Sequence, residues 1–204
     1  MAVDTPVQAQ AATTAPRERY RFTRQVYHAL IEARVFDEHS RVELVQGDLV
    51  TMAAINPRHA SAVDRLTNML AAGVGRHAIV RVQNPFGIGD DSEPEPDVQL
   101  LKPNANYYAG RHPGPAEIYL AIEVSPTTVR YDREVKVPLY GTAGVAEMWL
   151  RDLNVDALEV YRQPSANGYD SMLRLKPGDH VAPLAFPDLN LEVAALLPPA
   201  EPGS

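Results

Sequence analysis

Two carboxylates stand at the ends of apolar runs, where side chains of neighbouring strands can meet. Glu123 lies near the end of the run that begins at Ile118, and Asp97 follows Pro96 at the head of another run. Burying an unpaired carboxylate costs free energy, so each should meet a cation, a hydrogen-bond donor or water. If the two ends were neighbours in a sheet, their oxygens would suit Mg²⁺, which binds one or two carboxylates, water and phosphate oxygens. Spacing alone leaves open the alternative that Glu123 simply reaches solvent.

The segment after Glu123 could supply a cation to this pocket. Asp132, Lys136 and Tyr140 recur every fourth residue, so a helix would align them on one face. On a solvated face an Asp–Lys pair at this spacing is only a weak surface stabilisation. The other interpretation is that Lys136 points back towards Glu123. There it could orient or deprotonate a metal-bound water and offset charge on a phosphate.

Two further side chains are candidates for the same site. His59 lies near the start of a predicted helix, and Glu43 alternates with apolar residues in a predicted strand, so it must point away from them. A lone histidine is more often structural than catalytic. No histidine pair has the spacing of a motif such as HExxH, and the chain has no cysteine, so the sequence does not support a zinc hydrolase.

Hydrophobic periodicity gives the elements that must position these residues. Thr23 is a candidate N-cap for a helix with an apolar stripe at Val26, Tyr27, Leu30 and Ile31, and Asn56 or Pro57 opens a second helix that ends near Ala72 at Gly73 and Gly75. Thr127 or Thr128 caps a third helix reaching about Tyr140, which Pro138 bends. A hairpin is predicted around Gly47-Asp48, and strands at 79–82, 97–101, 118–124, 147–151, 158–161 and 172–175.

Strand alternation assigns faces within the run around Glu123. It puts Tyr119, Ala121, Glu123 and Ser125 on one face, and Ile118, Leu120, Ile122 and Val124 on the other. The order of elements predicts an α/β (α+β) fold, in which helices flank a mixed β-sheet with additional antiparallel strands.

Length and composition further limit the possible domain organisation, location and binding partners. The 204 residues fit one domain, expected over residues 19–197 between tails at 1–18 and 198–204. No export signal or membrane-spanning run is evident, so we expect a cytoplasmic protein that does not contact a membrane. The net charge of -7 argues against strong sequence-blind binding to nucleic acid. Two groups of basic residues, at 17–24 and 130–136, are more simply explained as solvated surface.

Several short motifs occur together, in order, from about Tyr20 to Leu197. They are Val42-Glu43-Leu44-Val45-Gln46-Gly47-Asp48-Leu49, His59, Pro96-Asp97-Val98, Ile122-Glu123-Val124-Ser125-Pro126-Thr127-Thr128, Asp132, Lys136-Val137-Pro138-Leu139-Tyr140 and Gly144-Val145-Ala146-Glu147-Met148-Trp149-Leu150. With this ordered set the chain resembles the Uma-two family of restriction-endonuclease-like proteins, within the PD-(D/E)xK nuclease superfamily.

The resemblance implies a restriction-endonuclease-like core and a role for each matching residue. Asp97 and Glu123 would be metal ligands together with the backbone carbonyl of Val124. The usual lysine two residues after the second acid is replaced by Ser125, and Lys136 on the helix matches the lysine of this family. Three further residues match site positions: Glu43 as an acid that completes the metal shell, Asp132 as a group that orients Lys136, and His59.

The expected function is therefore hydrolysis of DNA phosphodiester bonds by a Mg²⁺- or Mn²⁺-dependent endonuclease, acting as a homodimer. Two alternatives remain open. One is a catalytically inactive module that keeps the fold for binding or self-association, which the acidic charge and the missing strand lysine favour. The other is a metallohydrolase acting on a smaller phosphodiester.

Overall fold

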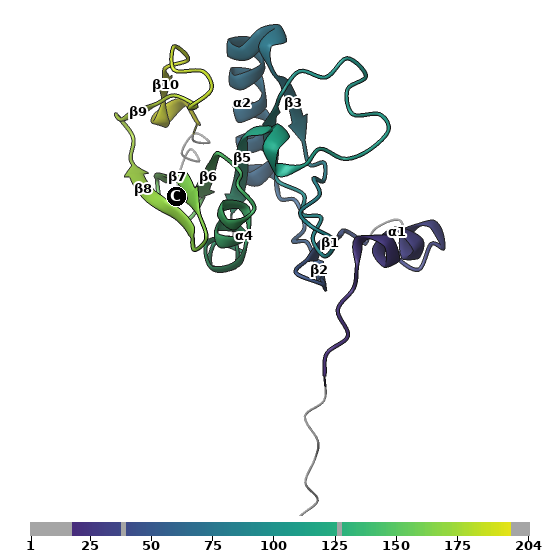
Figure 1. The fold of residues 1–204 in the computed structure, drawn as a ribbon. Coiled ribbons are helices and arrows are strands. Elements are labelled where there is room, and N and C mark those ends of the chain that lie inside the picture. Colours follow the sequence, from purple (N-terminus) through teal and green to yellow (C-terminus); the bar gives the residue numbers. More distant parts are fainter. Residues whose placement is uncertain (1–17, 38–39, 126–127, 197–204) are drawn as a thin grey trace, which may run out of the picture.

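A computed structural model describes residues 18–37, 40–125 and 128–196 (Figure 1). The predicted tails, 1–18 and 198–204, lie outside the described residues except for Glu18, as does Thr127, one of the two candidate caps of the third helix. None of the helices in the described ranges is long and apolar enough to cross a membrane.

A six-stranded mixed sheet forms the centre of the molecule, in the order β3-β4-β5-β6-β7-β8. The strands are β3 (Ile79–Val82), β4 (Val98–Leu101), β5 (Ile118–Ser125), β6 (Glu147–Asp152), β7 (Ala157–Ser165) and β8 (Gly168–Leu175). Only the β5–β6 pairing is parallel; the other four are antiparallel. The predicted fold class, a mixed sheet flanked by helices, is confirmed. The helical segment between β5 and β6 provides the crossover that a parallel pair needs.

One face of the sheet packs against α2 (Pro57–Val74). The Asn56 side chain accepts a hydrogen bond from the His59 N–H and Pro57 occupies the first turn, as the sequence predicts. The prediction that Gly73 ends the helix is wrong. Gly73 lies inside α2, where a Cβ would come within 2.3 Å of Leu189, so this glycine allows close packing. Gly75 at the C-cap has a positive φ of 51° and ends the helix.

The opposite face packs against the helical segment that carries Lys136. This segment consists of α3 (Val129–Tyr131), a π-helical turn η3 (Asp132–Lys136) and α4 (Val137–Thr142). The Val137 N–H bonds to the Asp132 carbonyl, five residues earlier, directly before Pro138, which has no N–H to donate. Thr128 precedes α3, but its side chain accepts no hydrogen bond from the helix; its hydroxyl donates to Asp132 Oδ2. The capping role predicted for Thr128 is therefore wrong.

The alternation predicted for β5 holds only from Leu120 onwards. Leu120, Ile122 and Val124 join the core beneath α2, but Ile118 packs with the core on the other face. Leu100 pairs with Leu120 and Leu101 with Ile118, so Tyr119 is an extra residue in a β-bulge. A bulge of one residue reverses the facing of all that precede it.

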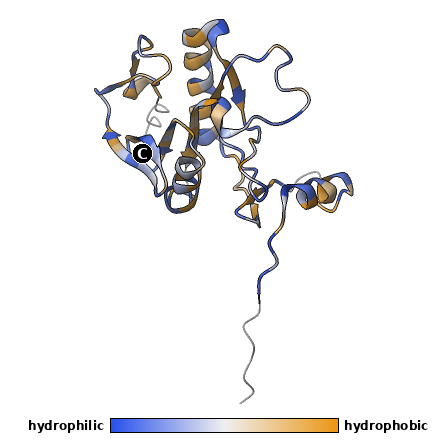
Figure 2. Cartoon of the chain, in the orientation of Figure 1, coloured by the Kyte–Doolittle hydropathy of each residue, from blue (hydrophilic) through white to orange (hydrophobic). Residues whose placement is uncertain are grey.

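Smaller elements surround the sheet (Figure 1). The predicted hairpin is β1 (Val42–Val45) with β2 (Asp48–Thr51), and its turn has positive φ at Gln46 and Gly47. Beside it lies α1 (Arg24–Glu32), capped by Thr23 as predicted and coloured both hydrophobic and hydrophilic in Figure 2. The remaining elements are η1 (Gly75–His77), η2 (Pro115–Glu117), β9 (His180–Val181), β10 (Leu191–Glu192) and η4 (Val193–Leu196).

Candidate active site

One cavity of about 280 Å³ brings together all of the site residues proposed from the sequence. Asp97 precedes β4, Glu123 and Val124 belong to β5, and Glu43 belongs to β1. The other elements contribute His59 from α2 and Asp132 and Lys136 from η3. The walls also include apolar residues from β2 and the segment that follows it. Convergence of these side chains was the main structural expectation, whereas their chemical roles stay predictions.

Lys136 is the centre of the charged cluster. Its ammonium lies 3.1 Å from Glu43 Oε2 and 3.2 Å from Glu123 Oε1, and the side chain is only 6% exposed. Burial alone would lower the pKa of Lys136, but the attraction of Glu123 and Glu43 outweighs it and raises the pKa above its ordinary value. Lys136 is therefore an ammonium at neutral pH, suited to donate hydrogen bonds and offset negative charge.

Glu123 is held from two sides. Its Oε1 contacts Lys136 and also accepts a 2.6 Å hydrogen bond from the Tyr140 hydroxyl. Burial raises the pKa of Glu123 well above its ordinary value; Lys136 opposes this, and the nearby Asp132 and Asp97 reinforce it. A carboxyl in this situation gains from any additional cation that approaches it.

The Asp97 carboxylate has three polar partners. The Val124 N–H donates to Oδ2 at 2.8 Å, and the Gln83 side chain donates to Oδ1 at 3.2 Å. His59 Nε2 lies 3.0 Å from the same Oδ1, while His59 Nδ1 is buried without a hydrogen-bond partner. The contact between Asp97 and Val124 places the head of β4 against the end of β5, as the pocket hypothesis requires.

Asp132 is buried but is not bonded to Lys136. Its carboxylate accepts from the Thr128 hydroxyl at 3.0 Å, and Thr128 in turn contacts the Ser125 hydroxyl at 3.0 Å. Burial raises the pKa of Asp132, with Lys136 opposing. Asp132, which is expected to orient Lys136, makes no direct bond to it among the described residues, and Glu43 and Glu123 hold the lysine.

Acidic side chains outnumber basic ones in the lining of the cavity. Four buried carboxyl groups, on Glu43, Asp97, Glu123 and Asp132, share it with the buried ammonium of Lys136. Oxygen donors crowded in this way are the ligand chemistry of Mg²⁺ and Mn²⁺. The donor set therefore fits a divalent cation, with Asp97 and Glu123 as its predicted ligands.

The sequence interpretation gave no role to several residues of this site. Tyr140 was already aligned with Lys136 by its spacing, which could have indicated its hydrogen bond to Glu123. Gln83, Glu95 and Arg41 carried no local signal. Glu95 donates its N–H to Glu43 Oε2 at 3.1 Å, and both Glu95 and Arg41 line the cavity.

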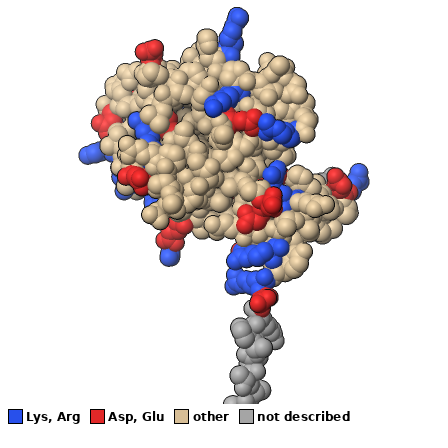
Figure 3. All heavy atoms as spheres, viewed as in Figure 1, with Lys and Arg blue, Asp and Glu red and all other residues tan. Residues whose placement is uncertain are grey.

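The two groups of basic residues are largely neutralised by acids. Arg130 pairs with Glu134, and Arg133 pairs with Glu159. Arg21 and Arg24 pair with Asp48 and Glu93, Arg19 is exposed, and Arg17 lies outside the described residues. Figure 3 accordingly shows acidic and basic side chains interspersed over the face in view, with basic ones grouped at the N-terminal segment.

Comparison with known proteins agrees with the fold and shows the family. One solved structure, a "putative nuclease belonging to DUF820 from Anabaena variabilis ATCC 29413", superposes with a TM-score of 0.66 at 17% identity, covering 82% of this chain and 96% of that chain. Among curated proteins no sequence matches. The sequence model of the Uma2 family, described as "Putative restriction endonuclease", matches residues 24–194. Since this match spans most of the chain, the protein belongs to the Uma2 family.

Proposed function

We propose that the protein is a Mg²⁺- or Mn²⁺-dependent endonuclease that hydrolyses DNA phosphodiester bonds. The observation that carries the proposal is that four buried carboxyl groups and Lys136 line a single cavity. Membership of a family described as restriction endonucleases supports the nuclease class. The choice of metal and of DNA as substrate is our inference from the donor chemistry and that membership.

Each side chain has a role that its contacts support. Asp97 and Glu123, with the Val124 carbonyl, would hold the cation, and Glu43 would complete the acidic shell. The bound cation would lower the pKa of a coordinated water and offset charge on the phosphate. Lys136 is kept protonated by its ion pairs with Glu43 and Glu123. It therefore donates hydrogen bonds to the reacting oxygens rather than acting as the base.

Three side chains have supporting roles in this scheme. His59 and the Val124 N–H fix the Asp97 carboxylate from opposite oxygens. Asp132 acts on Lys136 through its charge, without a direct bond. Arg41 lines the cavity, and in this scheme it would bind a phosphate of the DNA substrate next to the one that is cleaved.

A plasmid-nicking assay tests the proposal. Purified protein with Mg²⁺ or Mn²⁺ should convert supercoiled plasmid to the open-circular form, and EDTA should stop the reaction. Asp97→Ala and Lys136→Ala should remove the activity, whereas exposed Lys176→Ala is the matched control and should retain it. Nicking by both active-site variants at the wild-type rate would mean that a contaminant or another site is responsible.

Calorimetric titration with Mn²⁺ separates this function from an inert module. The proposed enzyme should bind Mn²⁺ in a manner that Asp97→Ala weakens strongly. If Mn²⁺ binds but plasmid stays intact, small phosphodiester substrates are the next to assay. Light scattering would test the expected homodimer. A DNA substrate is compatible with the cytoplasmic location expected from the sequence.

A further inference from the structure

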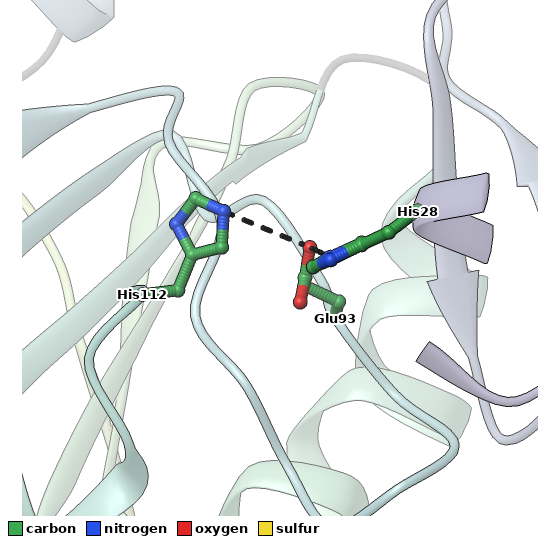
Figure 4. A group of neighbouring side chains, drawn as sticks. All are labelled: His28, Glu93 and His112. Atoms are coloured by element: carbon green, nitrogen blue, oxygen red, sulfur yellow. Dashed lines mark hydrogen bonds and ion pairs between the residues drawn. The ribbon is translucent and has the colours of Figure 1, made fainter. Parts of the chain in front are cut away.

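A second cluster of metal-ligating side chains lies outside the candidate active site (Figure 4). His28 belongs to α1, Glu93 to the loop before β4, and His112 to the loop before η2. One ligand atom from each lies within 4.8 Å of the others. None of the three lines the acidic cavity. Figure 4 shows Glu93 between the two histidines, which approach it from different segments.

Glu93 is held so that one oxygen faces both imidazoles. The Glu93 N–H bonds to the Leu44 carbonyl at 2.7 Å, which ties its backbone to β1. Arg24, one turn before His28 on α1, bonds to Oε2 at 2.8 Å. The other oxygen, Oε1, lies 2.8 Å from His28 Nε2 and 3.8 Å from His112 Nε2. Hydrogen bonding of a ligating carboxylate by an outer group is the usual construction of metal sites.

The two distances from Glu93 lie on either side of the value for a tetrahedral site, and the ligand atoms of the two histidines are within 4.8 Å of each other. Zinc–ligand bonds are about 2.0–2.2 Å for His and Glu, which puts neighbouring ligand atoms about 3.4 Å apart. The distance from Glu93 Oε1 to His112 Nε2 is slightly longer than this, and the distance to His28 Nε2 slightly shorter. Both histidine side chains are partly exposed, at 43% and 37%, so small rotations would equalise the two distances.

We propose that His28, Glu93 and His112 bind a transition-metal ion of the Zn²⁺ class, with water in the fourth position. Two imidazoles favour Zn²⁺ over Mg²⁺, which prefers oxygen ligands alone. Imidazoles bind metal in the neutral form. The exposed sides of the histidines leave room for the water.

Such an ion would fasten α1 to the rest of the protein. α1 has nine residues and buries only Tyr27, so it depends on contacts outside itself. Its links to the rest of the protein include the Arg24–Glu93 pair and the Tyr27 hydroxyl, which donates to the Val42 carbonyl at 2.7 Å. A metal shared by α1 and two loops adds a link to each. The alternative is that the same residues form only a hydrogen-bonded cluster. Titration with Co²⁺ distinguishes a metal site from such a cluster.

Co²⁺ is the probe, because four-coordinate Co²⁺ has strong visible bands that the aqueous ion lacks. Metal-free wild-type protein titrated with Co²⁺ should develop these bands at one equivalent, and Zn²⁺ should displace them. His28→Ala and His112→Ala should each weaken Zn²⁺ binding at least about tenfold, the lower end of the effect that even outer-shell groups have. Exposed His77→Ala is the matched control, and Asp97→Ala should leave the bands unchanged, which separates this site from the candidate active site.

Amide exchange gives a second readout. Zn²⁺ should slow exchange of the α1 amides in the wild type and in His77→Ala, but not in His112→Ala, whose folding is checked by circular dichroism. Absence of the Co²⁺ bands in the wild type, or bands that persist in either His28→Ala or His112→Ala, would overturn the three-ligand site. Neither measurement involves DNA, so the proposed metal site is tested independently of the proposed nuclease activity.

Discussion

Replacing Lys136 by Met removes the only buried ammonium of the acidic cavity while keeping most of the side-chain volume. Its two partners, Glu43 and Glu123, are 3% and 5% exposed and would lose their cation. Removing one partner of a buried ion pair typically costs about 3–5 kcal/mol, because the remaining charge is left without compensation. We therefore expect Lys136→Met to be strongly destabilised when no metal is present.

The corresponding change in melting temperature is large enough to measure. For a domain of this size, 1 kcal/mol corresponds to roughly 2–4 °C, so the variant should melt about 6–20 °C below the wild type in EDTA. Scanning calorimetry of Lys176→Met supplies the control, since this lysine is exposed. A double-mutant cycle with Glu43→Gln should recover part of the loss, because the two side chains are in contact.

Metal binding distinguishes this interpretation from a general loss of structure. Without Lys136 the cavity is more negative, so Mn²⁺ should bind at least as tightly as to the wild type and should raise the melting temperature of the variant more. Nicking should nevertheless be lost, because the proposed donor to the reacting phosphate is gone. A variant that melts within about 2 °C of the wild type in EDTA, well inside the range just derived, would refute the charge-balance argument. So would markedly weaker Mn²⁺ binding.

Three further changes test other parts of the structure. Gly141→Ala would place a Cβ 2.3 Å from the Gly168 backbone, so it should lower the free energy of unfolding by about 1–3 kcal/mol in urea titrations; an unchanged midpoint would contradict the close approach of α4 to β8. Tyr140→Phe removes the 2.6 Å hydrogen bond to Glu123 and should cost about 1–3 kcal/mol in the same assay, and a stability equal to that of the wild type would show that this bond contributes nothing. The pKa of Glu117 is lowered to about 2, chiefly by hydrogen bonding from Arg111. The ionised carboxylate therefore stabilises the folded protein above the ordinary pKa of a glutamate, and this stabilisation is lost as the pH falls through about 2. The small melting difference between wild type and Glu117→Gln should therefore be present at pH 6 and vanish near pH 2, and a difference independent of pH would exclude the ion pair as its source.

The candidate site could be predicted largely because its signals are local. A carboxylate ending an apolar run, as at Glu123, is costly unless the fold provides a partner, so its neighbourhood must be special. The four-residue spacing of Asp132, Lys136 and Tyr140 placed them on one face, and the structure turns that face towards β5. The prediction that the site residues share one cavity followed from these constraints and from the ordered motifs.

The errors in the fold have equally local causes. The bulge at Tyr119 comes from the pairing register with β4, which alternation within β5 cannot reveal. Gly73 carried a helix-ending signal, but its purpose is contact with Leu189 more than a hundred residues later. β9 and β10 have two residues each, too few to show a period.

The cluster of His28, Glu93 and His112 was invisible for a different reason. Motifs such as HExxH signal metal because one helix presents both ligands, so their spacing is fixed. Here each ligand comes from a different segment, and 65 residues separate His28 from Glu93. Rejecting a zinc hydrolase from local spacing therefore gave no information about a metal site assembled by tertiary structure.

The displaced lysine makes the β1–β2 hairpin part of the candidate active site. In the usual motif a lysine two residues after the second acid would be fixed by the strand itself, and here Ser125 in that position uses its hydroxyl to contact Thr128. Lys136 instead comes from a π-helical turn, a feature common at functional sites, and needs a second anchor to be aimed. Glu43 on β1 provides that anchor, and its other contact is the Glu95 N–H. Because the Lys136 ammonium is held jointly by β1 and β5, a movement of the hairpin would shift the ammonium relative to Asp97. In the proposed mechanism the hairpin therefore positions Lys136 as well as lining the cavity.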